Sequence, residues 1–117
     1  MIKEMDVSQE QLEADIFLLR PTGKLDAKNS PNLRSVFQQL IDSPESKKII
    51  LDLQGVHFVD SSGLAALVSG LRLARENGCS LVLSGAQPQA QIVFRLTMLD
   101  RVFPIYASYQ EAQQDLM

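Results

Sequence analysis

The chain has 117 residues, of which 45% are hydrophobic and 6% aromatic, and its net charge is −3. A chain of this length forms one domain with a core of mostly aliphatic side chains, and we expect that domain to span residues 1–117. The acidic balance and the lack of a basic run argue against direct nucleic-acid binding and against an anionic membrane surface, because both partners attract clusters of Lys and Arg.

The sequence shows no targeting or membrane-spanning segment. Residues 1–6 carry charges where a signal peptide needs an apolar core. No apolar stretch approaches the roughly 18 residues of a membrane span. Cys79 and His57 are the single cysteine and the single histidine, so neither an intrachain disulfide nor a zinc site is predicted. We therefore expect a cytoplasmic protein that needs no cofactor and no metal.

The N-terminal part predicts an antiparallel hairpin. Residues 2–9 are a weak edge-strand candidate, and the polar run 8–11 reads as a turn. Residues 15–20 form a stronger strand, because they combine β-favouring residues in a short apolar run. Pro21 and Gly23 are expected to end that strand.

A helix and a buried strand are predicted next. Asp26 or Ser30 can cap the helix, and Pro31 suits its first turn. Its apolar residues have helical spacing: Leu33, Val36, Phe37, Leu40 and Ile41. Residues 47–53 are nearly continuously apolar, which is typical of a strand covered on both faces. After a turn at Gln54 and Gly55, we expect Val56 and Phe58 to fill the core at the sheet edge.

The remaining elements alternate between helix and strand. A helix follows Ser62, ends at Asn77–Gly78, and has one apolar face: Leu64, Leu67, Val68, Leu71 and Ala74. A short strand at 81–83 precedes a helix that begins at Pro88, with Ile92, Val93 and Leu96 as its stripe. Residues 103–106 suit an edge strand, and Ser108 with Glu111 forms a capping box before a terminal helix. The order predicts an α/β fold with a mixed sheet of four to five strands and about four helices.

The junction at Val59-Asp60-Ser61-Ser62-Gly63-Leu64 is the strongest functional candidate. Two hydroxyls and a carboxylate lie where a strand-derived loop becomes a helix. A helix N-terminus presents unpaired N–H groups and a partial positive charge, so it can hold a phosphate. Either Asp60 or Ser61 can cap this helix, and the pattern leaves both open.

Together these motifs resemble the STAS domain, in the form of the stand-alone bacterial anti-sigma factor antagonists. The resemblance runs from about Phe17 to Ala112. It is carried by Gly23-Lys24-Leu25-Asp26, by Ile50-Leu51-Asp52-Leu53 followed by Val59-Asp60-Ser61-Ser62-Gly63-Leu64, and by the later Leu81-Val82-Leu83, Pro88, Leu96, Leu99, Phe103 and Ile105. Lys24, Gly78-Cys79 and Leu99-Asp100 depart from the family's common residues, which bears on partner identity more than on fold.

The resemblance implies a phosphorylation-controlled partner switch and not an enzyme. In this family the second serine of the pair accepts phosphate from an anti-sigma factor that is also a serine kinase, and a PP2C-type serine phosphatase removes it. The unphosphorylated form binds the kinase and thereby releases the sigma factor. By resemblance Ser62 is the phosphoacceptor, and the partner-docking residues are Gly23, Leu25, Asp26, Asp60, Ser61, Ser62, Gly63 and Leu64.

Other functions remain to be weighed. The same fold can serve without phosphorylation, as a scaffold or as a nucleotide- or ligand-binding module in a signalling or transport assembly. A serine hydrolase is disfavoured because the Gly-x-Ser-x-Gly elbow is absent and His57 precedes the serines. A phospho-receiver domain is rejected because the first two strands are consecutive and no lysine follows Lys48.

Overall fold

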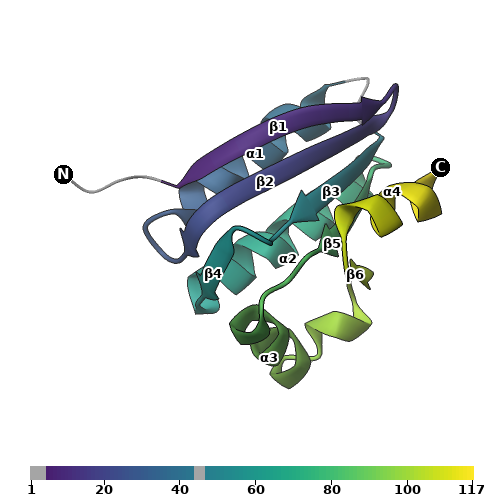
Figure 1. Cartoon of the computed structure of the whole chain (residues 1–117). Helices are drawn as coiled ribbons and strands as arrows, with labels where there is room; N and C mark the ends of the chain where they lie inside the picture. The colour runs from purple at the N-terminus through teal and green to yellow at the C-terminus, as the bar shows by residue number, and fades with distance from the viewer. Residues whose placement is uncertain (1–4, 44–46) are drawn as a thin grey trace.

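Six strands in one mixed sheet and four α-helices make up the computed structural model, which describes residues 5–43 and 47–117 (Figure 1). The strands are β1 (Asp6–Glu13), β2 (Ile16–Leu25), β3 (Lys48–Asp52), β4 (Val56–Val59), β5 (Ser80–Ser84) and β6 (Ile105–Tyr106). The helices are α1 (Ser30–Asp42), α2 (Ser61–Glu76), α3 (Pro88–Leu96) and α4 (Tyr109–Leu116), with a 3-10 turn at Leu99–Arg101. The sheet order is β1-β2-β3-β5-β6, and β4 pairs with β2. The predicted α/β class is confirmed, with one strand more than expected.

The N-terminal hairpin is antiparallel, as predicted, but longer. β1 pairs with β2 from Asp6↔Thr22 to Glu13↔Ile16, so residues 8–11 belong to the strand and not to a turn. Their side chains are exposed, and polar side chains of this kind are common on an edge strand. Of the edge strand expected at 2–9, residues 2–4 lie outside the described residues.

β2 also continues through the two residues that were expected to end it. Pro21 lies between the part of β2 that pairs with β3 and the part that pairs with β4, so its missing N–H interrupts neither parallel ladder. Gly23 has a φ of +108°, a backbone conformation that glycine adopts without strain. The prediction that β2 ends near residue 20 is therefore wrong, and the strand carries the chain as far as Leu25.

β3 and β4 lie one after the other along the same side of β2. β3 pairs with Ile16–Leu19 and β4 with Gly23–Leu25, both parallel. Val56 is buried as expected, but Phe58 is 39% exposed. The register of β4 shifts between its first two pairs, which is the mark of a β-bulge. The extra residue turns Phe58 away from the core and returns Val59 to it.

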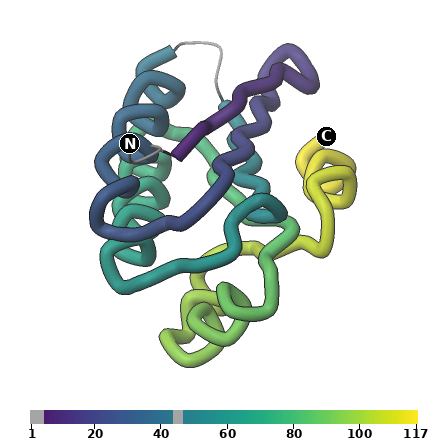
Figure 2. Tube along the Cα trace, turned by 60° about the vertical axis from the view of Figure 1, so that its left-hand side comes forward, coloured from purple at the N-terminus to yellow at the C-terminus, as the bar shows by residue number. Residues whose placement is uncertain are grey.

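The helices cover both faces of the sheet. Figures 1 and 2 show α1 and α2 side by side on one face and α4 on the other. The larger core includes Leu33 and Phe37 of α1 and Leu67 of α2, whereas a smaller cluster joins Ile50 of β3 to Ala112 of α4. The apolar stripe predicted for α1 is buried, apart from the half-buried Val36.

α2 buries small residues together with leucines against the sheet and α1. Leu67, Leu71 and Ala74 are buried as predicted, but Val68 is 36% exposed. Gly70 is buried, and a methyl group added there would stand 2.5 Å from Phe37 Cε2. The absence of a side chain at Gly70 therefore sets how closely α1 and α2 approach each other.

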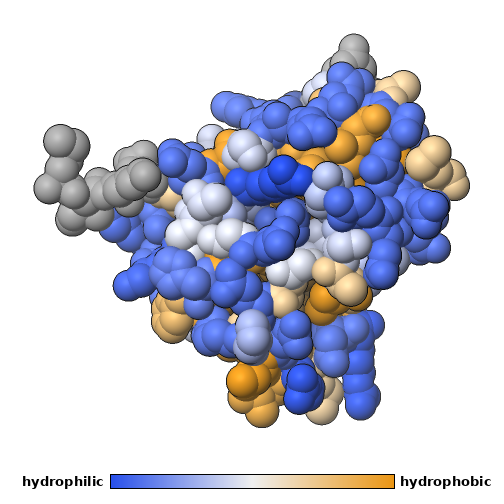
Figure 3. Space-filling model, viewed as in Figure 1, coloured by the Kyte–Doolittle hydropathy of each residue, from blue (hydrophilic) through white to orange (hydrophobic). Residues whose placement is uncertain are grey.

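α3 buries a different face from the predicted one. Ala90 and Phe94 point into the core, while Ile92 and Leu96 are 52% and 79% exposed. Ala90 with Phe94 and Ile92 with Leu96 both have helical i, i+4 spacing, so either pair could face the core. Burial of the large Phe94 ring favours the face that carries Ala90 and Phe94. Figure 3 shows hydrophobic surface at the lower end of the molecule, where Figure 1 places α3.

Candidate functional site

The carboxyl ends of β2 and β4 bring the two predicted motifs together. Leu25 pairs with Val59 in the parallel register, so Asp26 and Asp60 each follow directly on a strand end at the same edge of the sheet. The Asp60 main-chain N–H donates a hydrogen bond to the Leu25 carbonyl oxygen at 3.1 Å. Two segments far apart in the sequence thus form one surface.

Asp60 caps α2. Its backbone is extended, with φ −104° and ψ −173°, and its Oδ1 accepts a hydrogen bond from the Gly63 N–H at 2.9 Å. The helix therefore begins at Ser61, earlier than the sequence pattern predicts. The sequence leaves both Asp60 and Ser61 open as the cap. The structure assigns the cap to Asp60, because its carboxylate accepts from the N–H of a first-turn residue.

The two serines differ in exposure. Ser61 is exposed and Ser62 is half-buried. Their N–H groups precede the first intrahelical hydrogen bond, which Leu64 donates to the Asp60 carbonyl oxygen at 2.9 Å. Across residues 5–43 and 47–117, neither serine hydroxyl takes part in a hydrogen bond. Both hydroxyls thus lie at the positive end of the helix without a hydrogen-bond partner among the described residues.

Two of the predicted docking residues lie below the surface. Leu25 is 0% exposed, and Gly63 is buried against it. A methyl group added at Gly63 would overlap the Leu25 carbonyl oxygen and stand 2.8 Å from Leu25 Cγ. Leu64 is half-buried and packs against the core. These buried contacts fix the distance between the first turn of α2 and the sheet. Asp26, Asp60 and Ser61, by contrast, are at least partly exposed to solvent.

Asp26 organises the turn before α1 instead of capping the helix. The N-cap position belongs to Asn29, which makes no side-chain cap hydrogen bond. Asp26 Oδ1 accepts from the Asn29 N–H at 3.0 Å, and the Asp26 carbonyl oxygen accepts from both the N–H and the hydroxyl of Ser30. The expectation of a side-chain cap by Asp26 or Ser30 is wrong, because both groups bond within the preceding turn.

Sequence reasoning missed two amides that hold this surface in place. The Asn29 side chain is buried, donates to the Lys24 carbonyl oxygen at 2.8 Å and accepts from the Met5 N–H at 3.2 Å. The Gln89 carboxamide accepts from the Val59 N–H at 2.9 Å and donates to the Val59 carbonyl oxygen at 3.0 Å. Met5 is 24 residues from Asn29, and Val59 is 30 residues from Gln89, so no local pattern signals these contacts.

A polar cluster lies at the carboxyl ends of β3 and β5, away from the serines. Asp52 is 4% exposed; its Oδ1 accepts from the Ser84 hydroxyl at 3.3 Å, and its Oδ2 lies 3.6 Å from Arg20 Nε. The Arg20 guanidinium also stacks on the Tyr109 ring at 4.5 Å, which ties α4 to the sheet. Asp52 and Tyr109 line a cavity of about 340 Å³.

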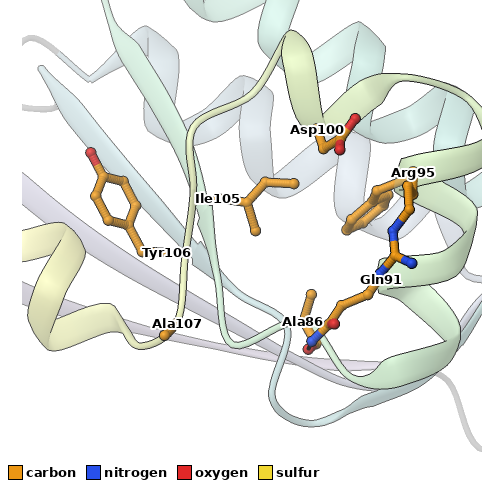
Figure 4. A pocket seen from close by; sticks show the side chains of 8 residues that line it. Ala86, Gln91, Arg95, Asp100, Ile105, Tyr106 and Ala107 are labelled. Atoms are coloured by element: carbon orange, nitrogen blue, oxygen red, sulfur yellow. Dashed lines mark hydrogen bonds between the residues drawn. The ribbon is translucent and has the colours of Figure 1, made fainter.

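Another hollow, of about 390 Å³, lies between α3 and β6. Figure 4 shows the side chains that line it. Its walls combine the apolar Ile105 with the charged side chains of Arg95 and Asp100. None of the predicted site residues lines it. In the part of the chain that the structure describes, no helix is long and apolar enough to cross a membrane.

Comparisons with known proteins agree with this fold. The family model described as the STAS domain matches residues 9–112. A curated relative from Paenibacillus polymyxa, the anti-sigma F factor antagonist, is 25% identical over 101 residues, which are 86% of each chain. The crystal structure of the Thermotoga maritima protein TM1081 superposes with a TM-score of 0.86 at 26% identity, covering 93% of this chain and 92% of the other. Unphosphorylated SpoIIAA superposes with a TM-score of 0.81 at 21% identity, covering 95% and 96%. Since the family model spans most of the sequence, the chain belongs to the STAS domain family, with anti-sigma factor antagonists among its relatives.

Proposed function

We propose that the protein is an anti-sigma factor antagonist whose partner binding is switched by phosphorylation of Ser62. The observation that carries this proposal is the unengaged Ser62 hydroxyl in the first turn of α2, beside the surface formed by Asp26 and Asp60. A phosphate on a hydroxyl in the first turn of a helix would lie near unpaired N–H groups that favour an anion. The single domain would span residues 1–117 and act in the cytoplasm.

The partners proposed are those of the curated relative's class. An anti-sigma factor that is also a serine kinase would bind the unphosphorylated form and transfer phosphate to Ser62. A PP2C-type serine phosphatase would remove it, and transcription would be regulated through the sigma factor released. SpoIIAA, which shares the fold, has been solved in phosphorylated and unphosphorylated forms, with TM-scores of 0.75 and 0.81 to this chain. That pair supports the view that the fold tolerates a phosphate.

The phosphate would act on the interface and leave the fold nearly unchanged. It adds about −1.5 to −2 charge to a chain of net charge −3. The helix dipole stabilises that charge by roughly 0.3–1 kcal/mol, and the adjacent Asp60 carboxylate opposes it by a similar amount. In a docked surface, however, a like-charge contact can cost several kcal/mol. Because each 1.4 kcal/mol is about tenfold in affinity, this is enough to release a partner.

The decisive experiment uses the cognate kinase with ATP and mass spectrometry. We expect phosphate on Ser62 of the wild-type chain and of Ser61→Ala, the matched control, and none on Ser62→Ala. In pull-downs Ser62→Ala should bind the kinase like the unphosphorylated protein, whereas Ser62→Asp should bind poorly while melting near the wild-type temperature. An active kinase that leaves Ser62 unmodified, or equal binding by both Ser62 variants, would favour the STAS scaffold or ligand-binding module instead.

A further inference from the structure

Within residues 5–43 and 47–117, no strand pairs with one edge of β4. Its other edge pairs with β2, and β5 pairs with β3 but not with β4. At the last residue of β4, Val59, the Gln89 side chain takes the place of a neighbouring strand. Its Oε1 accepts from the Val59 N–H at 2.9 Å, and its Nε2 donates to the Val59 carbonyl oxygen at 3.0 Å. One carboxamide thus satisfies both main-chain groups of Val59, as a strand partner would.

Val59 directly precedes the residue that caps α2. On the β2 side, the segment is held by the Leu25↔Val59 pair and by the hydrogen bond from the Asp60 N–H to the Leu25 carbonyl oxygen. On the open side it is held by Gln89. The backbone that leads into the serines is therefore held from both sides. Gln89, which provides the contact on the open side, belongs to α3.

The contact needs the chemistry of a glutamine. A carboxamide both accepts and donates, while a carboxylate only accepts and would set an oxygen against the Val59 carbonyl. Two other glutamines in this region bond elsewhere: Gln87 donates to the Gln54 carbonyl oxygen, and Gln91 donates to the Ala86 carbonyl oxygen. Gln91 lies on the same helix and makes one side-chain bond to main chain outside the site, so it offers a matched control.

We propose that Gln89 is a positioning residue for Ser62: it fixes the strand end from which α2 starts, and so the orientation in which the kinase meets the serine. We call the two hydrogen bonds between the Gln89 carboxamide and the Val59 main chain the clamp. This inference rests on the proposed function for its phosphorylation step, but the clamp does not depend on any partner. Phosphoryl transfer is sensitive to small displacements of the acceptor, so loss of the clamp slows transfer without removing the hydroxyl.

The clamp is tested first on the isolated protein by amide hydrogen exchange of Val59. Gln89→Met keeps the length of the side chain and removes both hydrogen bonds, and we expect Val59 to exchange about tenfold faster. Gln89→Glu keeps only the bond from the Val59 N–H and should give an intermediate rate. Gln91→Met should leave Val59 at the wild-type rate. An unchanged Val59 rate in Gln89→Met would overturn the inference.

The positioning role is tested by kinase assays on each variant. The assay temperature is one at which urea unfolding curves show that every variant is folded in the absence of urea. We expect Gln89→Met to lower kcat/KM for Ser62 by about tenfold, mainly through kcat, and Gln91→Met to leave it unchanged. Wild-type kinetics in Gln89→Met would show that the clamp stabilises the fold only, and would overturn the positioning role. If the wild-type chain itself accepts no phosphate from an active kinase, it is the proposed function that fails, and the exchange experiment still decides the clamp.

Discussion

The Leu25 carbonyl oxygen occupies the space that a side chain on Gly63 would need, so the first turn of α2 packs closely on the end of β2. The Asp60 N–H donates to the same oxygen at 3.1 Å. One main-chain oxygen therefore accepts a hydrogen bond from the residue that caps the helix and also excludes a side chain from Gly63. The position of the serines relative to the Asp26 loop depends on this contact.

Gly63→Ala should weaken the fold and the site together. The added methyl group overlaps the Leu25 oxygen, so the helix start must move or strain, at a cost of roughly 1–3 kcal/mol in the free energy of unfolding. Urea unfolding measures this cost. Ser69→Ala, on the exposed side of α2, is the control and should stay within about 0.5 kcal/mol of wild type. A fully stable Gly63→Ala protein would contradict the close contact.

Asp60 should stabilise the protein as a helix cap. Asp60→Ala removes the acceptor for the Gly63 N–H and should lower the free energy of unfolding by about 1 kcal/mol. Asp60→Asn keeps an oxygen acceptor and should remain close to wild type in thermal melting. If Asn proves as destabilising as Ala, the carboxylate charge and not the cap bond is what matters at this position.

The spacing of α1 and α2 should depend on Gly70 and Phe37 as a pair. Gly70→Ala brings a methyl group within 2.5 Å of the Phe37 ring, and we expect a loss of roughly 1–3 kcal/mol. Phe37→Leu frees that space, so the double variant should be less destabilised than the sum of the two single variants. A double-mutant cycle from urea unfolding gives the coupling, and simple additivity would show that the helices adjust independently of this contact.

Tyr106 should titrate above the usual tyrosine range. Its hydroxyl donates a hydrogen bond to Asp115, which raises the pKa of Tyr106 above 10.0, and burial and the nearby carboxylate charge act in the same direction. Because the folded pKa is raised, the neutral phenol's contribution to stability is present below the unfolded pKa and disappears as the pH rises through the folded value.

The pKa of Tyr106 is measured by ultraviolet titration of tyrosinate in a Tyr109→Phe background, which leaves one tyrosine. Asp115→Asn removes the charge and should lower the pKa of Tyr106 towards its usual value. Glu76→Gln, at the exposed end of α2, is the control and should leave the titration unchanged. The same midpoint with and without the Asp115 carboxylate would show that the hydrogen bond does not control this group.

Local patterns were sufficient where the deciding interaction lies within a few residues. The i, i+4, i+7 spacing of Leu33, Phe37 and Leu40 predicts α1 and its buried face. The Asp60-Ser61-Ser62 run marked a helix start, because an acidic or hydroxyl residue before an apolar period is a local capping signal. The capping box at Ser108 and Glu111 was recognised in the same way, and the Ser108 hydroxyl accepts from the Glu111 N–H at 3.2 Å.

The ends of strands and the buried faces of helices were mispredicted where they depend on contacts between residues distant in the sequence. Pro21 and Gly23 read as strand breakers, yet pairing with β1 on one side and β4 on the other carries β2 through them. The spacing of apolar residues in α3 allows either of two helix faces to be buried, and in the structure it is the face with Phe94 that packs in the core.

At the site itself, the sequence predicts a helix start that carries one carboxylate and two serines, and it leaves open whether Asp60 or Ser61 caps the helix. Only the folded chain decided how they are held. The Leu25 oxygen against Gly63 and the Gln89 carboxamide on Val59 are contacts between separate strands and helices. No local propensity encodes such contacts, because each depends on where the whole sheet places two remote pieces of backbone.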